Sequence, residues 1–271
     1  MIKIVDNIEI TEDDIRYAEE ILFGKTNIFD KDRIPIIEDF NNSFDVNACP
    51  GSGKTTVLLA KLIILSRKMP LNNGQGICVL THTNVAIDEI KSKLGDKSDI
   101  LFKYPNYFGT IQNFVDKYLA IPYFKKQKNE NIKTIDNDIY YDHIRKLSKL
   151  IYPQIRNSIQ YSVQKGWGNY TNESYEKNFI TFIDSKQFDI DTKEIKGNNN
   201  TVLTNRKFYE ELKDVMINKT LDKGILRYKD AYFLAGLYLK EFPELQNYFS
   251  NRFRYVFIDE MQDIDEIQIK F

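Results

Sequence analysis

The segment "ACPGSGKTT" at residues 48–56 places two glycines, a lysine and two threonines between a polar stretch and a long apolar one. A glycine-rich turn between a strand and a helix directs successive backbone N–H groups inward, and the helix N-terminus adds partial positive charge. Phosphate-binding loops follow the pattern G-x-x-x-x-G-K-[ST]. Gly53, Lys54 and Thr55 fill the end of this pattern, while Ala48 stands where its first glycine would be.

Each residue type in this loop suits phosphate chemistry. Gly51 and Gly53 let the backbone approach phosphates, Lys54 can reach the β- and γ-phosphates, and the Thr55 hydroxyl can ligate Mg²⁺. We therefore expect ATP and Mg²⁺ as cofactors, with the nucleotide contacted by Ala48, Cys49, Pro50, Gly51, Ser52, Gly53, Lys54, Thr55 and Thr56. The alternative is a helix N-terminus with a small-residue turn, no ligand and a solvated Lys54.

The residues around the loop favour a strand–loop–helix unit. "VLLAKLIILS" (57–66) predicts a helix that is apolar nearly all round, as in a helix packed against a sheet. Before the loop, Phe44, Val46 and Ala48 alternate with other residues as in a short strand.

A second segment, "YVFIDEMQD" (255–263), supplies carboxylates. Its apolar run 255–258 predicts a central strand buried on both faces, and ligands bind at the carboxyl ends of parallel strands. Asp259 is expected to bind Mg²⁺ and Glu260 to act as general base toward water. The alternative is an acidic strand end or first helical turn, which is favoured in any protein. The two segments together predict nucleotide binding.

Taken together, the two segments resemble the UvrD/Rep-like family of superfamily 1 helicases. That family's second motif is D-E-x-Q-D, and its phosphate loop begins with alanine, as at Ala48. The resemblance implies catalytic roles for Lys54, Glu260 and Gln262. It also implies an adenine-reading glutamine upstream, whose place in "FDKDRIPII" (29–37) is taken by Arg33. An arginine could stack on the base instead.

Two further segments resemble family motifs that touch single-stranded DNA. "CVLTHTNVAIDEIKSKL" (78–94) is similar to a strand and helix containing T-N-x-A-A-x-E-M, and "YFGTIQNFVDKYL" (107–119) is similar to one containing G-T-F-H. The expected nucleic-acid contacts are Thr81, Thr83, Asn84, Gly109 and Thr110. For the first three, plain helix capping explains the residue types equally well, with Asn84 as N-cap.

The fold class that follows is α/β, a P-loop NTPase of RecA-like type with a parallel sheet flanked by helices. We expect residues 1–119 and 226–271 to form this discontinuous, incomplete ATP-binding domain. Residues 120–225 then form a mostly helical inserted accessory subdomain, as the resemblance implies. The insert mixes cations with aromatics, as in "QKGWGNY" (164–170). Such residues can bind a nucleic-acid strand, or they can be a solvated face and a core.

Bulk composition sets further limits. The net charge of −1 gives no global attraction to nucleic acid, yet residues 120–227 carry 19 Lys and Arg against 14 Asp and Glu. No run of eighteen apolar residues and no signal-like N-terminus occur, so no membrane association and a cytoplasmic location are expected. Cys49 and Cys78, the only cysteines, are expected to be reduced and buried.

These observations predict an ATP-dependent DNA helicase or translocase acting on single-stranded DNA or DNA junctions, with 3′-to-5′ direction implied by the resemblance. Relatives continue into a second RecA-like domain that supplies an arginine finger, worth on the order of 10³ to 10⁵ in rate. We therefore expect an N-terminal portion with little turnover of its own, whose partner is that missing domain. The alternatives are a nucleotide-gated DNA-binding subunit of a phage-defence or nuclease complex, with a nuclease partner, and an RNA helicase.

Overall fold

The computed structural model describes residues 8–47, 49, 51–167, 169–171, 174–189, 192–197 and 203–260. Over these ranges the chain forms two compact units, one of residues 8–111 and 244–260 and one of residues 112–243. Ala48, Pro50 and Gln262, which the sequence predicts to belong to the site, lie outside the described residues.

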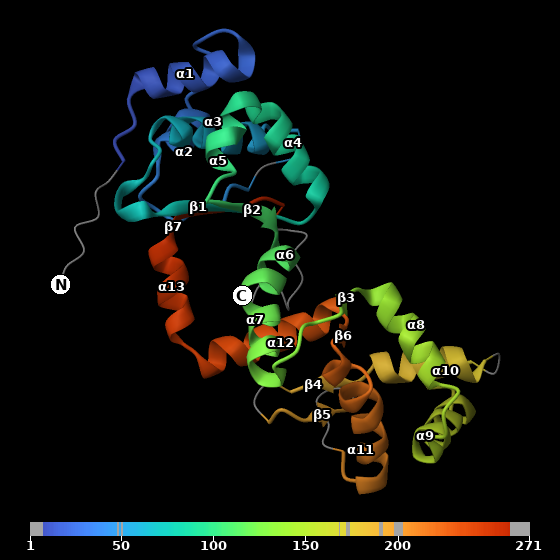
Figure 1. The fold of residues 1–271 in the computed structure, drawn as a ribbon. Helices are drawn as coiled ribbons and strands as arrows, with labels where there is room; N and C mark the ends of the chain where they lie inside the picture. The colour runs from blue at the N-terminus through green and yellow to red at the C-terminus, as the bar shows by residue number, and fades with distance from the viewer. Residues whose placement is uncertain are drawn as a thin grey trace. The chain divides into compact units, whose positions relative to one another are not determined.

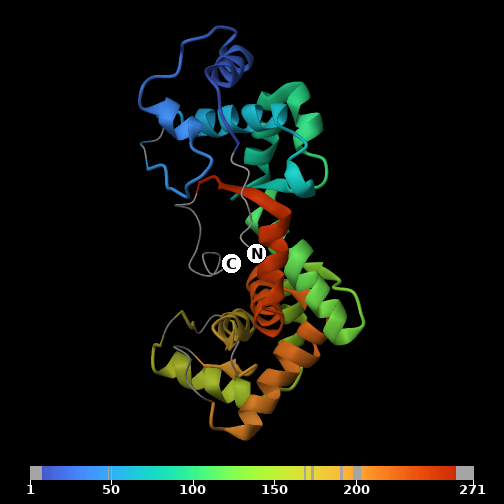
Figure 2. The same ribbon diagram turned by 90° about the vertical axis from the view of Figure 1, so that its left-hand side faces the viewer.

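The first unit is a parallel sheet with helices packed on it. Its helices are α1 (Glu12–Phe23), α2 (Arg33–Glu38), α3 (Lys54–Arg67), α4 (Asn84–Leu94), α5 (Ser98–Leu101) and α13 (Glu244–Arg252). Its strands are β1 (Gly76–Thr81), β2 (Tyr107–Thr110) and β7 (Phe253–Ile258), in the order β2-β1-β7. Helices α3, α4 and α5 lie on one face of this sheet (Figures 1 and 2). The predicted α/β class is confirmed.

Helix α3 forms the centre of the first unit's core. The predicted helix at 57–66 is confirmed, and it begins at Lys54, directly after the glycine turn. Six of its apolar side chains are 2% exposed or less: Leu59, Ala60, Leu62, Ile63, Ile64 and Leu65. Each large aliphatic side chain buried in this way stabilises the fold by about 1.5–3 kcal/mol. Burial of α3 on nearly all sides therefore holds the turn before it in a fixed position.

Two strand predictions for this unit are wrong in part. The expected strand before the loop is absent from the described residues 44–47, where Phe44 and Val46 are 43% and 38% exposed. The strand at 255–258 exists, yet β7 is an edge strand among the described strands. Tyr255 packs edge-on against Phe40 in the core, while Val256 is 55% exposed. Among the described elements, helices cover only one face of β7, and successive side chains of a strand point to opposite faces, so every second side chain of β7 stays accessible to solvent.

The two cysteines lie in different environments. Cys78, in the middle of β1, is buried as predicted, but Cys49 in the loop is exposed, so that prediction is wrong. The reason lies in the backbone, because Cys49 sits in a surface turn and not on a strand. Burial also raises the pKa of the Cys78 thiol to about 12.

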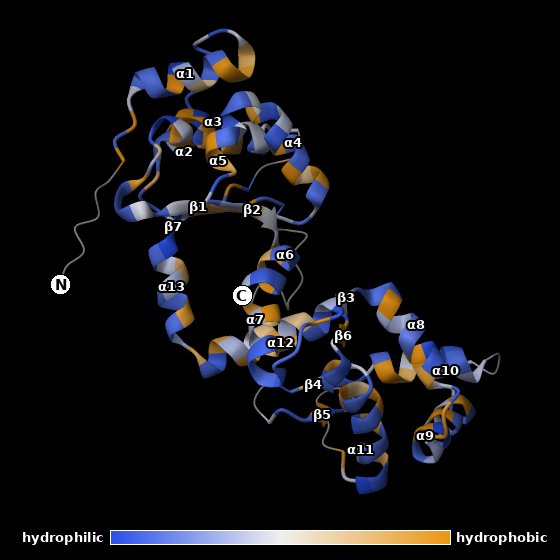
Figure 3. Ribbon diagram, in the orientation of Figure 1, coloured by the Kyte–Doolittle hydropathy of each residue, from blue (hydrophilic) through white to orange (hydrophobic). Residues whose placement is uncertain are grey.

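The second unit is mostly helical, but its bounds differ from those expected for the insert. Its helices are α6 (Ile111–Val115), α7 (Ile121–Lys128), α8 (Asn137–Leu147), α9 (Pro153–Gln164), α10 (Tyr175–Asp184), α11 (Arg206–Lys213) and α12 (Tyr228–Glu241). The unit covers residues 112–243 and not 120–225, because α6, α7 and α12 pack within it. Its short strands are β3 (Thr134–Ile135), β4 (Gln187–Phe188), β5 (Ile195–Lys196) and β6 (Ile225–Leu226). Helices α8, α10 and α11 carry both hydrophilic and hydrophobic residues (Figure 3). Such amphipathic helices bury one face in a shared core.

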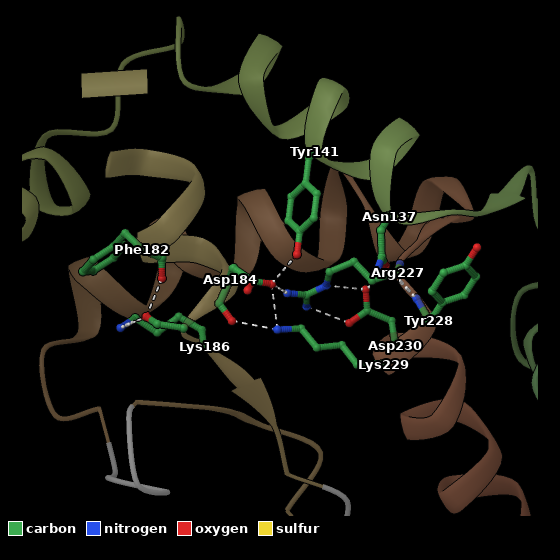
Figure 4. Close-up of polar contacts among 10 residues, drawn as sticks. Asn137, Tyr141, Phe182, Asp184, Lys186, Arg227, Tyr228, Lys229 and Asp230 are labelled. Atoms are coloured by element: carbon green, nitrogen blue, oxygen red, sulfur yellow. Dashed lines mark hydrogen bonds and ion pairs between the residues drawn. The ribbon is translucent and has the colours of Figure 1, made fainter. Parts of the chain in front are cut away.

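A buried ion-pair network joins three helices of this unit (Figure 4). Arg227, only 1% exposed, precedes α12 and donates to both carboxylate oxygens of Asp230, at 2.9 and 2.7 Å. Its Nη1 also lies 2.9 Å from Asp184 at the end of α10. Lys229 and the Tyr141 hydroxyl of α8 donate to the same Asp184 oxygen, at 2.7 and 3.0 Å. Burial would raise the pKa of Asp184, but Lys229 and Arg227 outweigh it and lower that pKa.

Candidate nucleotide-binding site

The glycine-rich turn begins the site. Gly51 and Gly53 have φ angles of 79° and 92°, in the left-handed region that favours glycine. The Ser52 N–H donates to the Cys49 carbonyl at 3.1 Å, which closes the turn, and the Val57 N–H donates to Gly53 at 3.0 Å. The first amide groups of an α-helix have no acceptor within the helix, and its dipole favours an anion there. The turn and α3 therefore form an anion-binding geometry.

Ser52 adds a hydroxyl that fits a phosphate. Its Oγ is buried and has no hydrogen-bond partner within the described part of the chain. A buried hydroxyl without a partner costs free energy, and such groups are rare in folded proteins. A phosphate oxygen would accept the missing hydrogen bond. The side chains of Lys54, Thr55 and Thr56 follow on the first turn of α3, each partly exposed.

Arg33 contacts this turn from α2. Its Nη2 donates to the Ser52 carbonyl at 2.9 Å, and its Nη1 pairs with Asp30, also at 2.9 Å. A Cβ built on Gly53 would lie 3.5 Å from Nη2, so the guanidinium rests against the glycine. The sequence suggested that Arg33 stacks on a base. In the structure two of its nitrogens instead hold the turn and Asp30.

Lys61 fastens the other end of α2 and was missed by the sequence analysis. From α3 its Nζ donates to the carbonyls of Ile36 and Asp39 at 2.5 and 2.7 Å and lies 4.3 Å from the centre of the Phe40 ring. Carbonyls at the end of a helix lack partners within it, so the ammonium satisfies them. Burial lowers the pKa of Lys61 to about 8, against the opposing effect of Asp39. The one indication in the sequence was a lysine inside an apolar helix.

The acidic pair lies at the carboxyl end of β7. The Asp259 N–H donates to the Leu80 carbonyl at 2.9 Å, which continues the pairing of β7 with β1 by one residue. Glu260 then turns away with φ at 54°, in the left-handed region, and its N–H donates to Asp259 Oδ1 at 3.2 Å. Both carboxylates are partly buried at this edge of the sheet.

Charges around Asp259 connect the two parts of the site. Burial raises the pKa of Asp259, the charges of Glu260 and Glu89 raise it further, and the charge of Lys54 lowers it. Lys54 and Asp259 thus lie within electrostatic reach although they are remote in sequence. Glu89, exposed on α4, is a third carboxylate in this environment, and it forms an ion pair with Lys93 at 2.5 Å. The neighbouring carboxylates Asp259 and Glu260 are oxygen donors of the kind that Mg²⁺ prefers, although the described residues contain no group of three ligands for a metal ion.

The residues predicted to touch nucleic acid divide into two groups. Thr81 is fully buried, and its hydroxyl donates to the Thr83 carbonyl at 2.8 Å. Thr83 is the N-cap of α4, since its side chain accepts from the Ala86 N–H at 3.3 Å. The expectation that Asn84 is the N-cap was therefore wrong by one residue. Thr83 and Asn84 are exposed at the start of α4.

Gly109 and Thr110 of β2 are buried. A Cβ on Gly109 would lie 2.6 Å from the Tyr107 hydroxyl, so the glycine makes room for this ring. Thr110 pairs with Thr81 in the register of β1 and β2. Packing within the sheet accounts for these residue types without a nucleic-acid contact.

The comparisons with known proteins agree on one family. A family model described as the UvrD/REP helicase N-terminal domain matches residues 30–271. The chain is also similar to a probable DNA helicase II homolog of Mycoplasma capricolum subsp. capricolum, with 25% identity over 225 residues. That match covers 82% of this chain and 29% of the relative, so the chain spans less than a third of the relative's length. Within the described residues, no helix is long and apolar enough to cross a membrane.

Proposed function

The chain belongs to the family of UvrD/REP helicase N-terminal domains, and from this premise we propose that it binds ATP with Mg²⁺ and drives movement of a DNA helicase along single-stranded DNA. The observation that carries the proposal is the glycine turn before α3, in which Gly51 and Gly53 are left-handed and the buried Ser52 hydroxyl has no hydrogen-bond partner within the described part of the chain. The charge of Lys54 also lowers the pKa of Asp259, which places the two side chains in one electrostatic environment. These observations support one site in which a phosphate-binding turn faces a metal-binding carboxylate. Movement in the 3′-to-5′ direction is part of the proposal.

Each residue has a separate role in this proposal. The amide groups of the turn, the Ser52 hydroxyl and Lys54 bind the phosphates, and Thr55 and Asp259 would ligate Mg²⁺. Bound Mg²⁺ supplies positive charge that offsets the charge of the phosphates. Glu260 accepts a proton from the attacking water. Gln262, whose catalytic role the family resemblance implies, lies outside the described residues.

The same proposal gives a role to the two units and to the residues outside the phosphate-binding turn. In this proposal the first unit, residues 8–111 and 244–260, is the ATP-binding domain, and the second unit, residues 112–243, is the accessory subdomain. The exposed Thr83 and Asn84 at the N-terminus of α4 remain candidate contacts for a DNA phosphate. Arg33, Cys49 and Thr56 remain candidate contacts for the nucleotide.

The test of this proposal is the Lys54→Ala variant. We expect it to lose binding of ATP–Mg²⁺, measured by titration calorimetry, because Lys54 contributes the positive charge nearest the phosphates. Lys103→Ala, which removes an exposed lysine of the same unit, should bind normally. In the complete gene product, single-stranded DNA should stimulate ATP hydrolysis, and Lys54→Ala should abolish this. Equal ATP binding by both variants would overturn the proposed site.

A further inference from the structure

The C-terminal end of α9 in the second unit presents two aromatic rings in a fixed arrangement. Lys165 is the C-cap of α9, and Gly166 follows in the left-handed region with φ at 63°. The Gly166 N–H donates to Val163 at 3.1 Å, and the Trp167 N–H donates to Ser162 at 3.0 Å. These two hydrogen bonds define a Schellman motif, which fixes the residue after the glycine against the last turn of the helix.

The fixed residue is Trp167, and its neighbour on the last turn is Tyr161. The ring centroids lie 5.3 Å apart, with the planes at 84° to one another. A hydrophobic contact of this kind ordinarily accompanies the motif and covers both side chains. Here Trp167 stays 56% exposed and Tyr161 50% exposed. The contact thus fixes the orientation of the rings and leaves a flat face of aromatic surface open to solvent.

The segment that carries the rings has positive charge and no acidic residue. Residues 157–172 contain no Asp or Glu and one cation, Lys165. Lys165 is exposed, and its Nζ lies 5.8 Å from the centre of the Tyr161 ring. A cation beside open aromatic faces matches a ligand that carries both a flat ring and a negative charge.

We propose that Tyr161, Lys165 and Trp167 form a stacking site for single-stranded nucleic acid, in which a base stacks on the exposed rings and Lys165 contacts a neighbouring phosphate. The inference rests on the proposed function, because a motor that moves along a single strand presents unpaired bases. Stacking on aromatic rings does not depend on base identity, since every base has a flat face. The positive charge of Lys165 and the lack of Asp or Glu in residues 157–172 favour an anionic ligand with flat rings over a second copy of the chain.

The chain contains one tryptophan, so Trp167 reports directly on its own site. We expect intrinsic fluorescence to be quenched, in a saturable way, on titration with oligothymidylate in the absence of ATP. An abasic oligonucleotide of the same length should give little quenching, because it offers phosphates without bases. Quenching by oligouridylate as well supports stacking, since the sugar is not read by the rings.

Variants separate the two parts of the site. Tyr161→Ala keeps the fluorophore and should weaken oligothymidylate binding roughly 5- to 100-fold, the range for loss of one base–aromatic stack. Lys165→Gln should reduce the slope of affinity against salt by about one. Tyr248→Ala is the matched control, because Tyr248 is 53% exposed and packs edge-on against Phe249 at 5.3 Å in the first unit. That variant should bind as the wild type does.

The outcomes distinguish this inference from the proposed function. Loss of ATP binding in Lys54→Ala with quenching retained supports both. A chain that binds ATP through Lys54 but shows no quenching, or shows equal quenching by the abasic oligonucleotide, overturns the stacking site alone. Quenching by a protein partner, with no quenching by any oligonucleotide, also overturns the stacking site. Circular dichroism of each variant checks that it is folded.

Discussion

Glu260, the proposed general base, has an uncommon backbone conformation. A non-glycine residue with φ at 54° costs of order 1 kcal/mol or more, and such strain persists where the surroundings determine it. The Asp259 N–H donates to the Leu80 carbonyl, so the pairing with β1 reaches Asp259, and the chain turns at the next residue. The turn places the Glu260 carboxylate beside Asp259, where its charge helps to raise the pKa of that group.

This geometry predicts the behaviour of Glu260→Gln in the complete gene product. The variant should bind ATP–Mg²⁺ normally, because an amide of the same shape keeps the site intact. Its turnover should fall by roughly 10²- to 10⁴-fold, the usual contribution of a positioned base. Steady-state ATPase measurements at saturating ATP test this, with Glu38→Gln on the exposed end of α2 as control. Unchanged turnover would remove Glu260 from the mechanism.

At the scale of elements, α2 is fastened at both ends to the phosphate-binding turn and its helix. Arg33 holds the Ser52 carbonyl at one end, and Lys61 of α3 satisfies the carbonyls of Ile36 and Asp39 at the other. Both contacts are made by cations to backbone oxygens, so they fix the backbone whatever side chains lie between. Helix α2, through Arg33 at one end and Lys61 at the other, therefore acts as a brace that holds the phosphate-binding turn in place.

The brace predicts an unusual dependence of stability on pH. Lys61 has a pKa of about 8 in the folded chain against 10.5 for a lysine in water, so between these values the unfolded state binds more protons. The free energy of unfolding should then rise with pH in this window, by up to about 1.4 kcal/mol per unit, relative to Lys61→Met. Urea unfolding at pH 8 and pH 10 measures the difference. Lys103→Met should keep the wild-type slope, and parallel curves for wild type and Lys61→Met would contradict the assignment.

Elements with a strong local pattern were predictable from the sequence, and contacts that depend on neighbours were not. The apolar run 57–66 gave α3, and the runs around Cys78 and Tyr255 gave β1 and β7. The alternation at Phe44 and Val46 did not give a strand, because a strand also needs a partner that the local sequence does not specify. The site followed the same rule. The turn and the acidic pair were visible as motifs. The contact of Lys61 with the carbonyls of α2, and the charge of Glu89 near Asp259, depend on tertiary packing and were not visible.

At the scale of the whole molecule, the second unit depends on the Arg227 network for the arrangement of α8, α10 and α12. Removing one partner of a buried ion pair leaves the other charge uncompensated, which costs about 3–5 kcal/mol. We expect Arg227→Met to lower the urea concentration at which half of the chains are unfolded. Trp167 fluorescence measures this midpoint for the second unit, because Trp167 lies in it. Arg206→Met, at an exposed position of α11, should have little effect. A loss below about 1 kcal/mol would show that packing alone holds the three helices.

The parallel register of β1 and β7 has a consequence for how this chain can vary. Leu80 pairs with Ile258, and the next backbone hydrogen bond delivers Asp259 to the edge of the sheet. Successive side chains on a strand point to opposite faces, so deletion of one codon within 253–258 would turn the acidic pair toward the wrong side. Exchange of the accessible side chains Val256 and Ile258 would leave this register unchanged, whereas the proposed roles of the two carboxylates require a strand of constant length.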